Sequence, residues 1–215
     1  MTPVETLRER KKRRTRDALL HAALDLFTTQ GYEQTTVDEI TEAVEVSQRT
    51  FFRYFPGKEE AALAVQAMAE AHFIQAVCER PPHEPPLEAL RQAMLEGWET
   101  VHEAIDSVVP VETYLRMFRV IESTPVLFAA YLRRSVDTEE TLARLLAERE
   151  GVNVDADPRP RLLVAVFGGV MRLTGRMWSV GDDFSMSAMR DLTRSYLDQV
   201  GPELIGSWRQ DHPSG

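Results

Sequence analysis

Apolar residues recur along this chain at intervals of three and four, the spacing that lines one face of an α-helix. The first such stripe comprises Leu19, Leu20, Ala23, Leu24 and Phe27. No segment alternates apolar and polar positions in the manner of a strand, so the pattern predicts an all-α protein. About nine helices are expected, over residues 10–30, 37–44, 48–54, 58–79, 87–105, 107–122, 125–150, 159–180 and 186–209.

Local start and stop signals separate these helices. Gly31 is expected to end the first helix, and Thr36 is expected to cap the second with its hydroxyl group. Four prolines lie between residues 81 and 86, and they forbid a continuous helix there. We expect a three-helix domain over residues 1–57 and a larger helical domain over residues 58–215, entered through one long helix.

The second and third helices form a compact pair, and Ser47 is expected to cap the third. The positions predicted to be buried in this pair are Val37, Ile40, Val44, Val46, Phe51 and Phe55. Four aromatic residues lie between residues 51 and 55, and one short helix cannot bury them all. Phe52 is therefore expected at the surface. The alternative is that Phe52 and Tyr54 are both core aromatics.

The outer face of the third helix carries side chains that suit the edges of DNA bases. They are Gln48, Arg49, Phe52 and Arg53. Arginine can bond guanine through two donors, glutamine can bond adenine, and an aromatic ring can pack against a thymine methyl group. Thr36, Tyr54 and Lys58 are placed to contact phosphate oxygens. The pattern predicts a helix-turn-helix that reads double-stranded DNA.

Charge is distributed unevenly along the chain, whose net charge is −9. Residues 1–58 carry ten basic and nine acidic side chains, whereas residues 59–215 carry fifteen basic and twenty-five acidic ones. Seven of the nine residues from 8 to 16 are basic and form a cationic arm. A basic tail can serve only to keep a protein soluble. Its position beside the helix pair instead favours an N-terminal end that is oriented toward phosphates.

Several positions of the helix pair agree in order and spacing with a known family. They are Thr36-Val37, Ile40, Val46-Ser47, Thr50, Phe52, Tyr54-Phe55 and Lys58-Glu59. In these residues the chain resembles the TetR family of transcriptional regulators, over about residues 16–63, and the resemblance adds Thr50 to the expected DNA contacts. The chain departs from the family pattern at Glu45 and Arg49, where glycine is usual, and at Thr41, where alanine is usual. Glu45 stands in the turn, where the backbone often requires a positive φ.

The resemblance implies a homodimer whose two reading helices enter successive major grooves of a palindromic operator. It also implies a repressor that a small apolar or amphipathic ligand releases, with the helix over residues 58–79 as the lever. In the family the last two helices form a four-helix bundle between subunits. The interface residues expected on that basis are Gly168, Gly169, Arg172, Gly175 and Tyr196. Arg172 and Arg176 could pair with acids across that interface or hold an anionic end of a ligand.

The larger domain is rich in methionine and aromatic residues, which can line an adaptable apolar pocket. The candidates are Met68, His72, Trp98, His102, Tyr114, Phe118, Phe128, Tyr131, Phe167 and Met171. Each of them alone could instead belong to a packed core. The five histidines show no spacing typical of metal ligands, so we expect neither a metal nor a cofactor.

Three classes of function can be compared. The first is a ligand-responsive repressor, and the second is a helical architectural or partner-binding protein that binds DNA without an inducer. An enzyme is not expected, because no glycine-rich phosphate loop and no plausible pair of nucleophile and base is present. We expect a cytoplasmic protein without a membrane partner, since no apolar run approaches ~20 residues. Its one cysteine, Cys78, excludes an internal disulfide.

Overall fold

The computed structural model describes residues 6–106 and 108–201, except for the side chains of residues 99–104. Over these ranges the chain forms ten α-helices and no strand, which confirms the expected all-α class. The helices are α1 (Leu7–Thr29), α2 (Val37–Ala43), α3 (Gln48–Phe52), α4 (Lys58–Ala62), α5 (Ala64–Glu79), α6 (Pro86–Asp106), α7 (Val111–Ser123), α8 (Pro125–Glu150), α9 (Arg159–Ser179) and α10 (Met186–Leu197).

One expected helix is divided into two. The helix predicted over residues 58–79 is interrupted at Leu63, which lies between α4 and α5 with φ −93° and ψ 1°. Neither proline nor glycine occurs within this stretch to mark the interruption. The element expected to act as a single lever therefore contains a joint near its start.

The first helix is longer than expected. It begins at Leu7 because Thr6 and Glu9 form a capping box, in which the Thr6 N–H donates to the Glu9 carboxylate at 2.8 Å. The cationic segment from residue 8 to 16 is consequently helical throughout, and its residues 8–14 are exposed.

Two other boundaries also differ from the prediction. The helix expected from residue 107 begins at Val111, because Pro110 occupies its N-cap and disfavours helical backbone in the residue before it. The last helix ends at Leu197, and turns follow to residue 201. The remainder of the predicted last helix, residues 202–209, lies outside the described residues.

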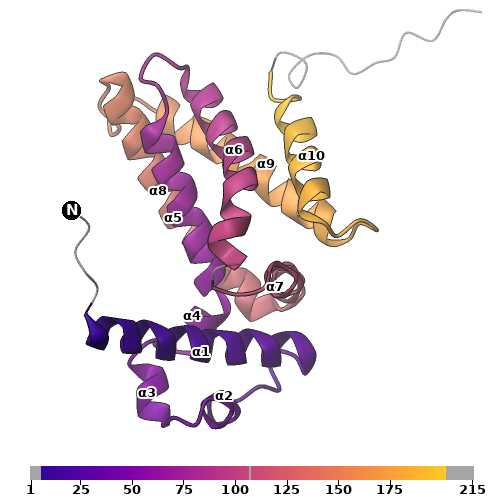
Figure 1. The fold of residues 1–215 in the computed structure, drawn as a ribbon. Coiled ribbons are helices and arrows are strands. Elements are labelled where there is room, and N and C mark those ends of the chain that lie inside the picture. Colours follow the sequence, from indigo (N-terminus) through magenta and orange to yellow (C-terminus); the bar gives the residue numbers. More distant parts are fainter. Residues whose placement is uncertain (1–5, 107, 202–215) are drawn as a thin grey trace, which may run out of the picture.

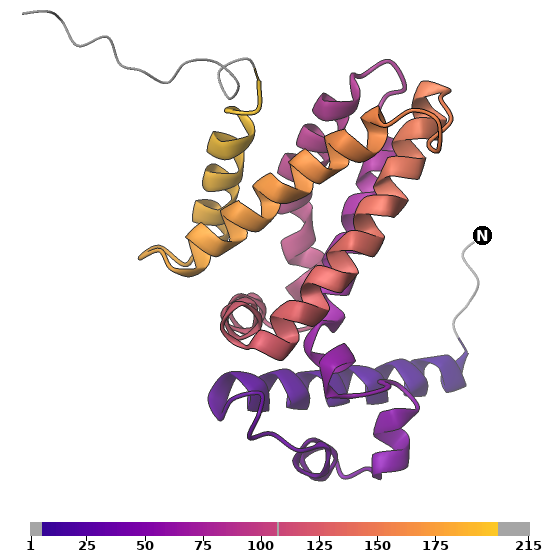
Figure 2. The same cartoon turned by 180° about the vertical axis from the view of Figure 1, so that it is seen from behind.

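Helix α1 lies across one end of the molecule (Figure 1). Helices α2 and α3 pack on one side of it and form with it the head, while α4–α10 form the body on its other side (Figures 1 and 2). A single hydrophobic cluster joins the two, since it includes Phe27 of α1, Phe51 of α3, Ala61 of α4 and Met117 of α7. The boundary expected between residues 57 and 58 stays a prediction, because the core continues across it.

The far half of the body has a second core. Its buried members come from five helices and include Val77, Leu90, Leu146, Phe167 and Leu197. In Figure 2 the long helix α8 rises away from the head, and α9 begins beside its upper end and diverges from it. Between the two cores, α5–α10 enclose the cavity described below.

Candidate nucleic-acid interface and ligand cavity

Two helix caps that were predicted from the sequence, at Thr36 and Ser47, organise the head. Thr36 and Glu39 form a second capping box at the start of α2, in which the Thr36 N–H donates to the Glu39 carboxylate at 2.8 Å. These hydrogen bonds hold the pKa of Glu39 below its ordinary value. At α3 the Ser47 hydroxyl accepts from the Thr50 N–H at 3.3 Å. Thr36 is exposed, whereas Thr50 is half-buried beside its cap.

The turn between α2 and α3 contains a left-handed residue. Glu45 has φ +54°, so this residue adopts the positive φ for which the family pattern usually has glycine. Thr41 is buried, its hydroxyl donates to the Asp38 carbonyl at 3.0 Å, and its carbonyl accepts from the Val46 N–H at 3.0 Å. These bonds hold the turn in shape around a residue for which this conformation is strained.

Helix α3 presents the expected outer face. Phe51 and Phe55 are buried and Phe52 is 50% exposed, which confirms the predicted orientation of the three rings. Gln48, Arg49 and Arg53 are exposed as well. Phe52 thus shares an exposed face with Arg49 and Arg53, and these side-chain types suit the edges of DNA bases.

Two members of this face already have partners within the chain. The Gln48 amide nitrogen donates to the Asp38 carboxylate of α2. The Arg53 guanidinium lies 4.9 Å from the centre of the Tyr54 ring and donates to its hydroxyl at 3.2 Å. Both pairs fix side chains that are free to turn on an isolated helix, and Tyr54 itself is half-buried.

Lys58 has an internal role that the sequence did not indicate. Its ammonium group donates to the backbone carbonyls of Tyr32 at 2.8 Å and Thr35 at 2.7 Å, and it lies 4.4 Å from the centre of the Tyr32 ring. Partial burial lowers its pKa, although Glu33 and Glu39 oppose the shift. Lys58 therefore ties the start of α4 to the loop before α2, and a phosphate contact by it stays a prediction.

The first turns of α1 extend past α3 in Figure 1. The basic residues from 8 to 14 are exposed, whereas Arg16 is half-buried. Arg16 lies over the Phe55 ring, 5.4 Å from its centre, and so joins the basic helix to the core of the head.

The body contains a cavity of about 150 Å³ between α5, α6, α7, α8, α9 and α10. Six predicted residues line it, namely His72, Trp98, Tyr114, Phe118, Tyr131 and Met171. Met68 and Phe128 do not line it, and the side chain of His102 lies outside the described residues. Phe167 instead stacks on Phe73, with ring centres 5.7 Å apart, and lines a neighbouring space of about 140 Å³. The sequence could not separate these residues because all of them lie on apolar helix faces.

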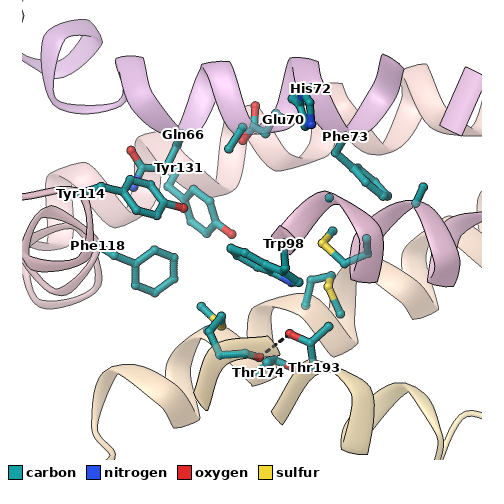
Figure 3. A pocket seen from close by; sticks show the side chains of 17 residues that line it. Gln66, Glu70, His72, Phe73, Trp98, Tyr114, Phe118, Tyr131, Thr174 and Thr193 are labelled. Atoms are coloured by element: carbon teal, nitrogen blue, oxygen red, sulfur yellow. Dashed lines mark hydrogen bonds between the residues drawn. The ribbon is translucent and has the colours of Figure 1, made fainter. Parts of the chain in front are cut away.

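Three polar side chains in the cavity wall are buried without partners in the described part of the chain, and the sequence analysis had named only one of them, Trp98, as a lining residue. Both amide atoms of Gln66, the indole Nε1 of Trp98 and the hydroxyl of Thr174 are buried without a hydrogen-bond partner among the described residues (Figure 3). The sequence could have indicated Gln66 as a lining residue, because it is polar within an apolar run and lies four positions before Glu70. Such spacing places both residues on one face of α5.

Glu70 marks the edge of the cavity and is already paired. The Nε atom of Arg134 donates to its carboxylate at 2.6 Å, and the Thr138 hydroxyl does so at 3.4 Å. Burial raises the pKa of Glu70, an effect that Arg134 opposes. Burial also raises the pKa values of Tyr114 and Tyr131, which keeps both phenols neutral.

The outer side of α9 carries an apolar stripe. Its exposed members are Leu162, Val166, Leu173, Met177 and Val180. Gly169 also faces open space, because a Cβ atom added there would meet nothing within 4 Å.

Three of the expected interface residues have other surroundings. Gly175 is buried, and a Cβ atom added to it would lie 2.7 Å from Cζ of Phe118, so the close approach that this glycine permits is between α9 and α7 of one chain. Gly168 makes room for an ion pair between Arg172 and Glu139 of α8. Arg172 thus has an acidic partner within the subunit, whereas Tyr196 is half-buried on α10.

Membrane segments and metal sites are two other features that the helices could provide. Among the described residues, no helix is both long and apolar enough to cross a membrane. Over the same part of the chain, no three His, Cys, Asp or Glu side chains are grouped closely enough to hold a metal ion.

Two protein-family models match the chain. The model of bacterial regulatory proteins of the tetR family matches residues 19–65, and the model of the MftR C-terminal domain matches residues 84–204. The match to the first begins twelve residues after the start of α1 at Leu7, so the cationic segment from residue 8 to 16 precedes it.

Individual proteins are similar over nearly the whole chain. The HTH-type transcriptional regulator TcmR of Streptomyces glaucescens is 46% identical over 204 residues, covering 95% of this chain and 90% of its own. A Mycobacterium tuberculosis protein named as the mycofactocin biosynthesis regulator MftR is 26% identical, covering 92% and 98%. The solved structure of a TetR-family regulator from Syntrophomonas wolfei has a TM-score of 0.60 at 18% identity, covering 90% of this chain and 99% of its own, which shows a shared fold.

Proposed function

The chain belongs to the TetR family of bacterial regulatory proteins, and on this premise we propose that it represses transcription until a small ligand releases it from DNA. DNA-binding transcriptional regulation is common to this family, whereas repression and its release by a ligand are what we propose for this chain. One observation carries it. The same chain combines an exposed reading face on α3 with an aromatic-lined cavity, and one continuous hydrophobic cluster links the head to that cavity.

For DNA recognition, we assign base contacts to Arg49, Phe52 and Arg53. Their side chains project from α3 into solvent, and guanidinium groups beside an apolar ring suit guanine and the methyl group of thymine. Gln48 is a further candidate, although it must share its amide with Asp38. The hydrogen bond from Arg53 to Tyr54 supports this assignment because it orders a long side chain before DNA binds.

For phosphate contacts, we assign the basic turns of α1 the main role. Their side chains are exposed and the helix holds them at the edge of the head (Figure 1). Thr36, which caps the start of α2, and Tyr54, which lies just after the end of α3, remain candidates. Lys58 is a weaker candidate, because its ammonium group already donates hydrogen bonds to two backbone carbonyls.

We propose that the protein acts as a homodimer joined through α9 and α10. The stripe that includes Leu162, Val166 and Leu173 is apolar and uncovered in the single chain, which supports an interface there. Gly169 would allow a partner helix to approach α9 closely. Two heads related by a dyad would then read a palindromic operator.

Two routes connect the cavity with the head. Gln66 and Phe73 of α5 line the cavity, and α5 continues through the joint at Leu63 into α4, where Lys58 holds the loop before α2. Phe118 of α7 also lines the cavity, and α7 packs directly against α1. A ligand that displaces α5 or α7 would therefore change the position of the head.

Selection of duplexes from a randomised pool tests DNA recognition. The purified protein should enrich one palindromic site and sediment as a dimer. Leu173→Asp should yield monomers that bind the selected site weakly, because a buried charge would disrupt the interface. The exposed Val136→Asp, which also adds a charge but lies on α8, outside the proposed interface and the DNA-binding head, is the matched control. A monomeric wild-type protein, or a pool that shows no preferred sequence, would contradict the proposal.

A further inference from the structure

We propose that the cavity takes an uncharged, flat molecule that presents a hydrogen-bond donor and an acceptor side by side. The inference rests on the proposed function, which supplies the reason for a ligand, but its chemistry comes from the cavity wall. A primary amide or a hydroxyl group next to a carbonyl group on an aromatic ring has the required character.

The adjacent donor and acceptor are inferred from Gln66. This side chain is only 4% exposed and faces the cavity from α5, and neither its amide nitrogen nor its amide oxygen has a partner among the described residues. A buried amide normally satisfies both atoms, since an unpaired polar group in an apolar interior is unfavourable. A ligand that complements Gln66 therefore supplies an acceptor to the nitrogen and a donor to the oxygen.

Two more groups define the opposite side of the ligand. The indole Nε1 of Trp98 can only donate, so it requires an acceptor, whereas the Thr174 hydroxyl can do either. Thr174 is 1% exposed and lies on α9, across the cavity from Gln66, with Trp98 between them (Figure 3). The bound molecule thus carries polar atoms at both ends and is apolar in the middle.

The absence of charge on the ligand follows from the ionisable residues of the wall. Among the described lining residues there is no lysine or arginine to pair with an anion. Glu70 is the one carboxylate of that set, and Arg134 and Thr138 already hold it. His72, which also lines the cavity, lies near Glu70 and away from the Gln66 amide (Figure 3). Tyr114 and Tyr131 are phenols directed toward the centre of the cavity, where they offer hydrogen bonds without charge (Figure 3).

A flat shape follows from the rings that form the wall. The indole of Trp98 and the phenyl rings of Phe73 and Phe118 provide faces and edges against which another ring can stack. Met94 and Met171 complete the wall with flexible thioethers, which adapt to the outline of the molecule.

Paired probes test this inference. The probes are 2-naphthamide and 2-naphthoate, which share one ring system, whereas only the amide is neutral and carries an adjacent donor and acceptor. Calorimetric titration of the full-length dimer at pH 7 should show tighter binding of the amide by about tenfold or more. In Gln66→Met, which keeps the length of the side chain, this preference should be lost and the amide should bind about tenfold more weakly.

A stability measurement separates this role of Gln66 from a structural one. Without a probe, Gln66→Met should unfold at a higher temperature than the wild type, because two unpaired polar atoms leave the interior. Gln75→Met, made on the exposed face of the same helix, should change neither the midpoint nor the binding. A lower midpoint in Gln66→Met would mean that the amide is a structural group and would overturn the inference.

The affinities of the two probes also test the inference. Equal or tighter binding of naphthoate, no binding of the amide, or an amide affinity that Gln66→Met leaves unchanged would each overturn the inference. Operator binding is measured on the same samples by fluorescence anisotropy. If the amide binds as expected and the operator complex does not respond, the class of ligand stands and the proposed ligand-controlled repression fails.

Discussion

Replacement of Lys58 by methionine removes a charge from the start of α4 while preserving most of the packing of the side chain. In the wild type the ammonium group donates to the Tyr32 and Thr35 carbonyls at 2.8 and 2.7 Å. Methionine cannot donate, so neither carbonyl keeps this hydrogen bond. The loop before α2 would then lose these two ties to α4.

The magnitude follows from these two bonds. A hydrogen bond that involves a charged group contributes about 1.5–3 kcal/mol to stability. Lys58 is half-exposed, so water can replace part of this contribution, and we expect Lys58→Met to lower the free energy of unfolding by about 2 kcal/mol in total. Its effect on DNA should come through the looser position of α2, and the salt dependence of binding should be unchanged.

Urea unfolding at fixed protein concentration measures the first effect, and anisotropy of the selected duplex at several salt concentrations measures the second. Lys12→Met, which removes an exposed charge from α1, is the control. It should leave stability unchanged and reduce the slope of log K against log salt by about 0.9 for each phosphate that the protein no longer neutralises. If Lys58→Met reduces the slope as well and leaves stability unchanged, Lys58 binds phosphate and the bracing role is wrong.

Three other substitutions have defined outcomes. Arg49→Ala should weaken operator binding by about 1–3 kcal/mol and relax the preference at one base position, as read by repeating the duplex selection; a selected site that is preferred as before would show that Arg49 does not read bases. Glu45→Gly should raise the free energy of unfolding by up to about 1 kcal/mol, because the turn requires φ +54° there, and an unchanged or lower value would contradict strain at this position. Gly175→Ala should lower it by about 1–3 kcal/mol, since the new methyl group would lie 2.7 Å from Phe118, whereas Gly97→Ala, made where space is open, should not; equal effects in urea unfolding would refute the close approach of α9 and α7.

Much of the head could be predicted because its signals are local. The caps at Thr36 and Ser47 and the positive φ at Glu45 depend on residues within a few positions of each other. The exposure of Phe52 followed from counting the rings that one short helix can bury. The joint at Leu63 had no such signal, because the surrounding residues are mostly good helix formers and include neither proline nor glycine.

Sequence alone determined the fold class, the helix pair and its outward-facing residues, because hydrophobic periodicity and capping act over a single turn of helix. Tertiary structure decided what those side chains touch. It directed Lys58 to the carbonyls of a loop more than twenty positions away, buried Gly175 against Phe118 of α7, and brought Gln66, Trp98 and Thr174 together without partners. These contacts depend on how distant helices cross, and no local pattern records a crossing.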